Sequence, residues 1–227
     1  MIKEMGFIGI FNVNPAIIST LLIFSVLLLT FSLERFWTFM AYGGFSEDFW
    51  KRLKASVQAG RYHDARTLCE QSKNVFARVF FVALNSVHLS RADNEDMVQI
   101  EKENRVELLR KRLGLFATLS FVSPLVGLLG TVTGIMQAFH DLGRSGSGGA
   151  NIVAAGIAEA LVSTAAGIIV AVPAALLYNY FTYRLRGIGV RMNNLAHELI
   201  IMIYGGEETG DKPAQAKASE IRAKIVR

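Results

Sequence analysis

The chain has 227 residues, of which 52% are hydrophobic, and a formal net charge of +5 at pH 7. A soluble domain is usually less apolar, so the composition favours a membrane protein. The basic residues form no single stripe, which argues against a nucleic-acid-binding protein. With Cys69 as its one cysteine, the chain has neither an intrachain disulfide nor a cysteine metal cluster, and its four histidines lack metal-ligand spacing.

The first predicted element is a transmembrane helix over residues 15–37, preceded by a periplasmic N-terminal segment, residues 1–14. Its centre is the uncharged run Ile17–Leu33, which with its flanks reaches the roughly 20 residues needed to cross a bilayer. Asn14 and Pro15 have the pattern of an N-cap and a first helical position. A cleaved signal peptide is the alternative, which the length of the run and the lack of an A-x-A site disfavour.

Residues 38–112 are predicted to form a cytoplasmic helical domain. Ser46 has the position of a helix N-cap, and Gly60 has that of a helix stop. From about Asn94 the sequence reaches the second span without a proline or glycine, which predicts one long helix running into the membrane. A shorter helix in this domain has an apolar face, made of Phe76, Val79, Phe80 and Ala83.

Two further spans follow. Residues 113–139 are 27 uncharged residues, or about 40 Å of helix, so one end is expected to project beyond the hydrocarbon core of about 30 Å. A glycine-rich periplasmic loop, residues 140–151, leads to a third transmembrane helix with a cytoplasmic extension, residues 152–183. Residues 184–227 are predicted to be a cytoplasmic helix, stopped at Gly205–Gly206, and a mobile tail.

The distribution of lysine and arginine predicts the orientation. Of the 24 such residues, 13 lie in residues 38–112 and 8 in residues 184–227, whereas residues 1–14 and 140–151 hold one each. By the positive-inside rule, the two basic segments are cytoplasmic and the N-terminus lies on the outer side of the membrane. The predicted fold is all-α, with three transmembrane helices that extend into a cytoplasmic helical domain.

Small residues follow one face of each of the last two spans, at steps of three or four. Such stripes let membrane helices approach closely, so they predict tight packing, either within the chain or between copies. Each stripe also holds a threonine, whose hydroxyl has the alternative of bonding its own helix backbone. The residues are Gly127, Gly130, Gly134 and Thr131 on the second span, and Gly156, Ala160, Gly167 and Thr164 on the third.

Glu159 is the only charged residue inside the apolar runs of the predicted spans, about 10 Å from the outer end of the third, whereas Glu34 and Arg35 bound the first run. An acid at the centre of a span costs about 2.5–3.5 kcal/mol on insertion scales, and less toward the interface. Glu159 is therefore either a lock for helix packing or a group in an ion path or facing a charged partner helix. Ser163, about 40° around the helix, is predicted to share its face, and Thr164, about 140° away, to point elsewhere.

Two segments carry a family resemblance: "SPLVGLLGTVTGIMQAF" (123–139) and "GIAEALVSTAAGIIVAVPAALLYNYF" (156–181). Together they closely resemble the ExbB/TolQ/MotA proton-channel family, in its ExbB/TolQ branch. The resemblance implies an inner-membrane motor subunit driven by proton-motive force, five copies of which form a ring around a pair of single-span ExbD/TolR-like partners. The partner helix carries an aspartate, and its motion is passed to a TonB- or TolA-like protein for outer-membrane uptake or envelope maintenance.

The resemblance also implies residue roles. Thr131 and Thr164 match positions that line the ion path, Glu159 matches the family's third-helix glutamate, and Pro173 matches a proline that bends this helix. Ser163 stands where many proton-driven relatives have alanine. Sodium-driven relatives tend to carry an extra hydroxyl there, and oxygen ligands suit hard cations, so Na⁺ is the alternative to H⁺.

Other functions stay open at this stage. A gliding or secretion motor of the same family and a purely structural membrane scaffold are the alternatives. The spans contain no G-x-S-x-G, Ser–His pair or H-E-x-x-H, so neither an intramembrane hydrolase nor any other enzyme is predicted. No resident cofactor is expected.

Overall fold

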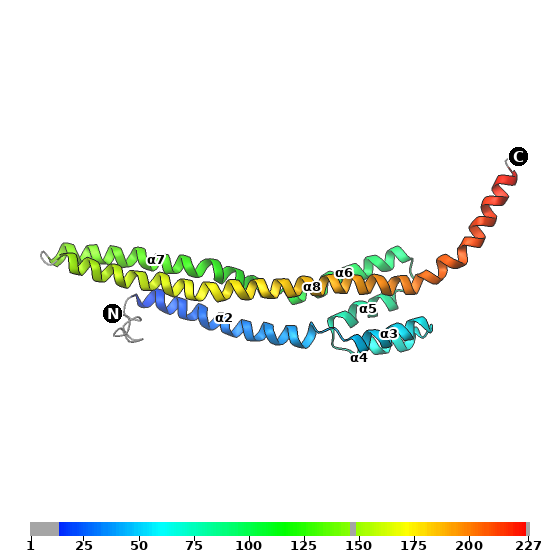
Figure 1. Ribbon diagram of the computed structural model, residues 1–227, viewed down its shortest axis with the longest axis horizontal. Coiled ribbons are helices and arrows are strands. Elements are labelled where there is room, and N and C mark those ends of the chain that lie inside the picture. Colours follow the sequence, from blue (N-terminus) through cyan, green and yellow to red (C-terminus); the bar gives the residue numbers. More distant parts are fainter. Residues whose placement is uncertain (1–13, 146–148, 226–227) are drawn as a thin grey trace. The chain divides into compact units, whose positions relative to one another are not determined.

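The computed structural model describes residues 14–145 and 149–205, except for the side chains of Tyr42, Ser145, Ala150 and Ile152, and the backbone of the last helix as far as Ile225. Every regular element in this part of the chain is a helix, which confirms the all-α prediction (Figure 1). The helices are α2 (Pro15–Tyr42), α3 (Glu47–Gln58), α4 (Tyr62–Gln71), α5 (Val75–Asn85), α6 (Arg91–Arg110), α7 (Leu113–Ser145) and α8 (Gly149–Ile225).

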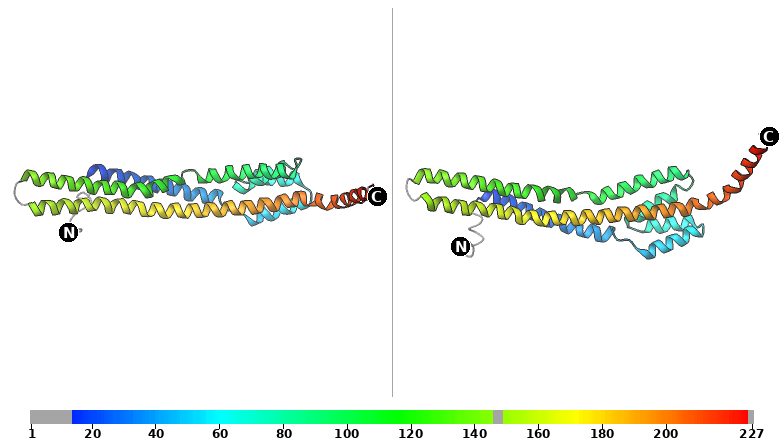
Figure 2. Two further views of the ribbon diagram at one scale, coloured as in Figure 1. Left: turned by 90° about the horizontal axis from the view of Figure 1, so that it is seen from above. Right: turned by 45° about the horizontal axis from the view of Figure 1, so that its top comes forward.

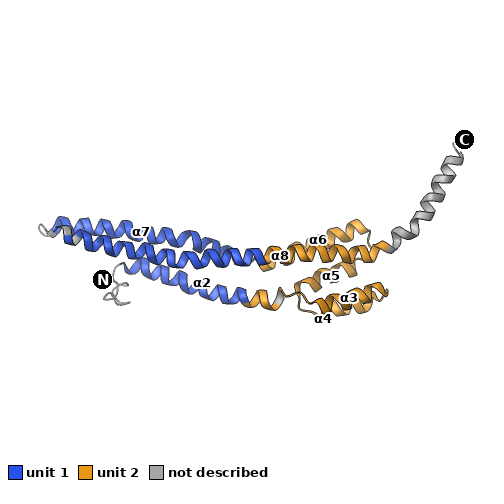
Figure 3. Cartoon of the chain, in the orientation of Figure 1, with its two compact units in different colours: residues 1–36, 110–184 blue, residues 37–109, 185–227 orange. Residues whose placement is uncertain are grey.

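The helices are distributed over two compact units (Figure 3). Unit 1 comprises residues 1–36 and 110–184, and unit 2 comprises residues 37–109 and 185–227, so α2 and α8 contribute to both. Among the described residues, three helices are long and apolar enough to cross a membrane, as predicted. These candidate spans are Pro15–Ala41, Leu113–Arg144 and Val153–Gly205.

Unit 1 contains α7 and the parts of the other two candidate spans up to residue 36 and residue 184, with α7 lying alongside α8 (Figures 1 and 2). Asn14 caps α2, as expected, because its Oδ1 accepts from the Ile17 N–H at 3.4 Å. Its amide also reaches α7, donating to Thr133 Oγ1 at 3.0 Å. Large apolar side chains point outward from all three helices, among them Leu29, Phe121 and Ile169. Such faces suit a lipid surrounding, where helices satisfy their own backbone hydrogen bonds.

Unit 2 packs α3–α6 around an apolar core. The predicted cap at Ser46 is confirmed, since its Oγ accepts from the Phe49 N–H at 3.3 Å. Gly60 follows the end of α3 in the left-handed region, at φ +70°, as a helix stop requires. The predicted apolar face of α5 is also confirmed: Phe76, Val79, Phe80 and Ala83 are at most 1% exposed.

A buried polar contact joins α6 to α8 inside unit 2. Asn94 is fully buried, and its Nδ2 donates to Ala83 O at 2.9 Å and to Tyr204 Oη at 3.0 Å. The Tyr204 hydroxyl lies 3.1 Å from Leu89 O, to which it donates. Buried polar groups need such partners, so these bonds fix where α6 and α8 meet.

The prediction of one helix from Asn94 into the second span is wrong. α6 ends at Arg110 and α7 begins at Leu113, and between them Arg112 adopts a left-handed φ of +67°. Residues other than glycine rarely do so without support from the surrounding structure. Here Glu34 of α2 forms an ion pair with Arg112, whose guanidinium also lies 5.9 Å from the centre of the Phe31 ring.

The predicted helix stop at Gly205–Gly206 is wrong as well, because α8 continues through both glycines and ends at Ile225. A glycine in a helix interior costs only about 1 kcal/mol relative to alanine, so a glycine pair weakens a helix without having to end it. The backbone of residues 207–225 of the predicted tail belongs to α8, residues 226–227 lie outside the described part of the chain, and the mobility of the tail stays a prediction.

Candidate functional site

The two small-residue stripes meet each other, so that α7 and α8 are in backbone contact within one chain. A Cβ atom placed on Gly127 would lie 2.8 Å from Ser163 O and 3.0 Å from Thr164 Cα. One placed on Gly167 would lie 2.6 Å from Ser123 O and 3.1 Å from Gly127 Cα. Any side chain at Gly127 or Gly167 would therefore collide with the main chain of the opposite helix.

The contact continues along both helices. A Cβ on Gly130 would lie 2.5 Å from Ser163 Cβ, and one on Gly134 would lie 2.8 Å from Ala160 Cβ. Toward the start of α8, Gly156 leaves room for the methyl group of Ala138 in the same way. Of the two arrangements left open by the sequence, packing within the chain is the one that the structure contains.

Two threonine hydroxyls lie inside this contact. Thr131 Oγ1 and Thr164 Oγ1 are 3.0 Å apart, with Thr131 buried and Thr164 half-buried. Each hydroxyl also has a carbonyl within reach: Leu128 O lies 2.7 Å from Thr131 Oγ1, and Gly127 O lies 3.2 Å from Thr164 Oγ1. Thr131 thus combines the two expected fates, since its hydroxyl bonds a carbonyl of its own helix and also meets Thr164. The carbonyl within reach of Thr164 belongs to the opposite helix, so both contacts of this hydroxyl join α8 to α7.

The hydroxyls of Thr131 and Thr164 have lone pairs that accept no hydrogen bond from each other. Each hydroxyl carries one hydrogen and two lone pairs, so two hydrogens are shared among four possible bonds, the fourth being from Thr131 Oγ1 to Gly127 O at 3.4 Å. Whichever way they are shared, oxygen lone pairs of Thr131 and Thr164 stay available to a proton donor or a cation. A polar group of this kind in an otherwise apolar contact is suited to receiving an ion.

Glu159 lies on the exposed side of α8, beside a groove of about 320 Å³. The groove borders the small-residue contact, and its polar lining includes Glu159, Asn14, Gln137 and Asp141. Asp141 accepts from the Gln137 amide at 3.0 Å. Asp141 was not among the predicted site residues, because the second span was predicted to end at residue 139. In the structure α7 extends to Ser145, and Asp141 lies on it beside the groove.

Ser163 does not share the face of Glu159, contrary to prediction. Its side chain is 0% exposed and packs against Gly130, whereas Glu159 is exposed. The 40° between the two residues is enough to carry Ser163 to the side of α8 that α7 covers. Within the described part of the chain, neither Ser163 Oγ nor Ser123 Oγ has a hydrogen-bond partner. Pro173 lies at an exposed position within the continuous α8.

The geometry defines a class of protein: a helical membrane protein with three candidate spans, the last two of which meet around a pair of hydroxyls. The model of the MotA/TolQ/ExbB proton channel family matches residues 71–194. The chain belongs to this family, as the resemblance of the two span segments indicated.

Relatives of known name place the chain in the ExbB/TolQ branch. Biopolymer transport protein ExbB of Salmonella typhimurium is 32% identical over 177 residues, covering 70% of this chain and 71% of the relative. Tol-Pal system protein TolQ of Pseudomonas aeruginosa is 33% identical over 182 residues, covering 75% of this chain and 77% of the relative. ExbB of Aquifex aeolicus is 39% identical over 102 residues, covering 44% of this chain and 66% of the relative.

Proposed function

We propose that this chain is the ion-path subunit of an inner-membrane motor, with its N-terminus periplasmic and its C-terminus cytoplasmic. Copies of it, five by family resemblance, surround an ExbD/TolR-like single-span partner. Together they convert proton-motive force into mechanical work, which a TonB- or TolA-like protein carries to the outer membrane. The observation that supports this most directly is the 3.0 Å contact between the hydroxyls of Thr131 and Thr164.

The physical argument starts from the contact between α7 and α8. An ion crosses an apolar region only where polar groups replace the water that it leaves behind. The described residues of this contact supply hydroxyl and carbonyl oxygens but no carboxylate, so the group that takes up and releases the proton belongs to a partner chain. One elementary charge crossing the membrane makes about 2.3 kcal/mol available per 100 mV, enough to bias a two-state movement.

Glu159 has a different role in this proposal. Its groove lies at the N-terminal end of α8, which is the periplasmic end under the proposed orientation. Glu159 and Asp141 both line the groove and raise the local concentration of cations, since a cleft lined by one sign of charge attracts the opposite sign. We assign Glu159 to ion entry or partner contact, and the threonine pair to the path itself.

Ion flux tests this assignment. With the single-span partner co-reconstituted in liposomes, Thr164→Ala is expected to lower flux by about 10- to 100-fold, because a hydrogen bond to a charged group is worth about 1.5–3 kcal/mol. Glu159→Gln is expected to lower flux also. The control is Thr118→Ala on the same α7–α8 pair, since the Thr118 hydroxyl is exposed and only bonds Gly114 O at 3.0 Å.

Unchanged flux in both Thr164→Ala and Glu159→Gln would refute the ion-path assignment. If instead both variants failed to assemble with the partner while the Thr118 control assembled, a structural scaffold would be the better description. Chromatographic recovery of the complex distinguishes these two outcomes before flux is measured.

The identity of the ion needs a separate experiment. We propose H⁺, so flux driven by an imposed proton gradient is expected to persist in sodium-free medium. Ser163→Ala should leave this flux unchanged, because the Ser163 side chain is 0% exposed and packs on Gly130. Flux that requires sodium and disappears in Ser163→Ala would instead identify a sodium-driven motor.

A further inference from the structure

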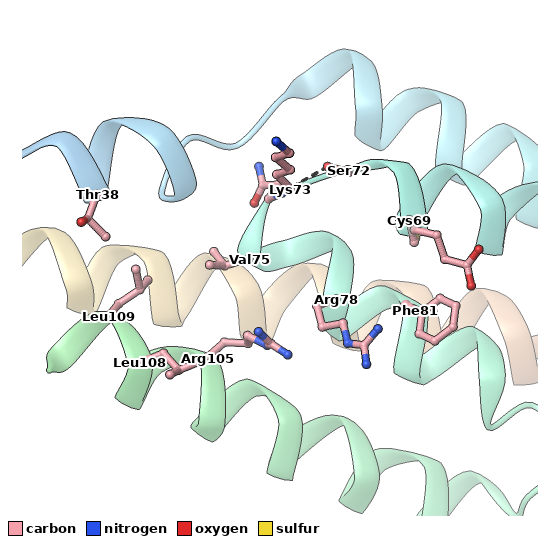
Figure 4. A pocket seen from close by; sticks show the side chains of 12 residues that line it. Thr38, Cys69, Ser72, Lys73, Val75, Arg78, Phe81, Arg105, Leu108 and Leu109 are labelled. Carbon is pink, nitrogen blue, oxygen red and sulfur yellow. Dashed lines mark hydrogen bonds between the residues drawn. The ribbon is translucent and has the colours of Figure 1, made fainter.

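Unit 2 contains a pocket of about 460 Å³ that the ion path does not use (Figure 4). Its walls come from the last turns of α2, the end of α4, the loop from α4 to α5, α5 itself, and the C-terminal half of α6. This volume lies within the range of about 300–1,000 Å³ that is typical of small-molecule sites. The pocket is lined by both charged and apolar side chains, and these indicate the chemical class of ligand that would fit it.

The charged lining has more cations than anions. Lys73, Arg78 and Arg105 line the pocket together with Glu70. Glu101, on α6 beside it, is shared by the two arginines, with its Oε1 at 2.6 Å from Arg105 Nη2 and 3.9 Å from Arg78 Nε. These five residues carry three positive and two negative charges, which leaves a net charge of +1 among them.

The two guanidinium groups have donors left over. Figure 4 shows Arg78 and Arg105 pointing into the same space between α5 and α6. Each guanidinium has five N–H donors, and one carboxylate cannot occupy those of both groups. Paired guanidinium groups are well suited to phosphate, because their flat forks match its oxygens.

The rest of the lining is apolar. Val75, Phe81, Leu108 and Leu109 line the pocket, together with Cys69, a buried thiol. Burial raises the pKa of the Cys69 thiol to about 12, so that it is neutral at physiological pH. A ligand that fits this lining is therefore amphiphilic, with an anionic group at one end and an apolar part at the other.

The pocket lies at the boundary of the candidate spans. Thr38, on its wall, belongs to the last turn of the candidate span Pro15–Ala41. Leu108 and Leu109 come only a few residues before the candidate span that begins at Leu113. This is the end of the spans that faces the lysine- and arginine-rich segments, where the headgroups of the cytoplasmic leaflet are expected.

We propose that this pocket binds the phosphate headgroup of an anionic phospholipid from the cytoplasmic leaflet. The phosphodiester lies between Arg78 and Arg105, and the start of the lipid's apolar part contacts Leu108 and Leu109. A monoanionic phosphodiester neutralises the net charge of +1 among the five charged residues. Basic pockets beside transmembrane helices on this side of a membrane suit such headgroups. The proposal shares the orientation of the proposed function but requires no ion path.

Lipid binding to the full-length chain tests the proposal. The delipidated protein in detergent is titrated with labelled phosphatidylglycerol or phosphatidylcholine, and bound lipid is counted. We expect saturable binding of phosphatidylglycerol alone. The double variant Arg78→Gln/Arg105→Gln should bind it roughly thirtyfold more weakly, because each basic residue beside an anionic lipid contributes about a fivefold factor.

The matched control removes two charges elsewhere in unit 2. Arg52 and Arg61 are exposed and lie outside the pocket, so Arg52→Gln/Arg61→Gln should bind phosphatidylglycerol like the parent chain. The single variant Arg78→Gln controls for misfolding of the double variant. The Arg78 side chain is 56% exposed and its Nε lies 3.9 Å from Glu101 Oε1, so its loss should disturb the fold little. This variant should bind about fivefold more weakly with an unchanged thermal transition.

Three results would overturn the proposal. Equal binding of the two lipids would show that the net negative charge of the headgroup is not recognised, because phosphatidylcholine has the same phosphodiester but a compensating choline cation. An equal loss in the Arg52/Arg61 control would assign the binding to general surface charge. Displacement of the lipid by an equal concentration of inorganic phosphate would identify a site for a free anion, and ion flux measured in parallel would show whether the proposed function survives that result.

Discussion

Replacing Gly127 with alanine is expected to lower the free energy of unfolding by about 1–3 kcal/mol, the usual cost of overpacking. Alanine is the better helix former by about 0.8–1.0 kcal/mol, so helix propensity alone predicts the opposite sign. The collision decides the outcome, because the added methyl group would lie 2.8 Å from Ser163 O and 3.0 Å from Thr164 Cα. Backbone atoms of α8 cannot move aside as a flexible side chain can.

The same substitution at Gly114 is the control. Gly114 also lies on α7, but a Cβ added there would meet no atom within 4 Å apart from its chain neighbours and the backbone of its own helix. Gly114→Ala should therefore leave stability unchanged or raise it slightly. Denaturation of the purified chain by titration with sodium dodecyl sulfate, followed by circular dichroism, measures both. Equal stability of the two variants would contradict the backbone contact between α7 and α8.

Replacing Arg35 with methionine is expected to destabilise the chain by about 1.5–3 kcal/mol, the worth of hydrogen bonds made by a charged group. Arg35 is only 6% exposed, and its guanidinium donates to Lys111 O at 3.0 Å and to Glu34 Oε1 at 2.9 Å. Methionine keeps much of the side-chain length but has no donors. The carbonyl of Lys111, at the junction of α6 and α7, then loses a partner.

Arg184→Met serves as the control for this prediction, because Arg184 is an exposed arginine of unit 1. Its stability should stay within about 0.5 kcal/mol of the parent chain, as is usual for surface substitutions. Limited proteolysis near Lys111 gives a second readout, since cleavage there should accelerate only in Arg35→Met. If the two variants were equally stable and equally resistant, Arg35 would not hold the junction.

Periodicity was sufficient to predict most of the membrane unit. Each span is a long apolar run, and steps of three or four residues put Gly127, Thr131 and Gly134 on one stripe of α7. A stripe of small residues has one main use in a membrane, which is close helix packing. The meeting of Thr131 with Thr164 follows once two such stripes face each other, and the structure brings their hydroxyls to 3.0 Å.

The remaining features depend on contacts between segments far apart in the chain. The break at Arg112 has no proline or glycine to announce it, and its left-handed φ is supported by Glu34 and Phe31 from α2. The burial of Ser163 depends on which side of α8 is covered, and angles around one helix contain no information on its neighbour. The pocket that contains Arg78 and Arg105 likewise joins residues from four helices.

The exposed position of Glu159 has a consequence for the biogenesis of the protein. A carboxylate on an exposed face of a candidate span makes membrane insertion less favourable, by up to about 2.5–3.5 kcal/mol at the bilayer centre. Any chain that covers Glu159 with a polar surface removes this penalty. Under the proposed function, the subunit alone in the bilayer is therefore less stable than the assembled subunit, and newly made copies gain stability by joining the proposed complex early. Unassembled copies are the ones that membrane quality control is expected to degrade first.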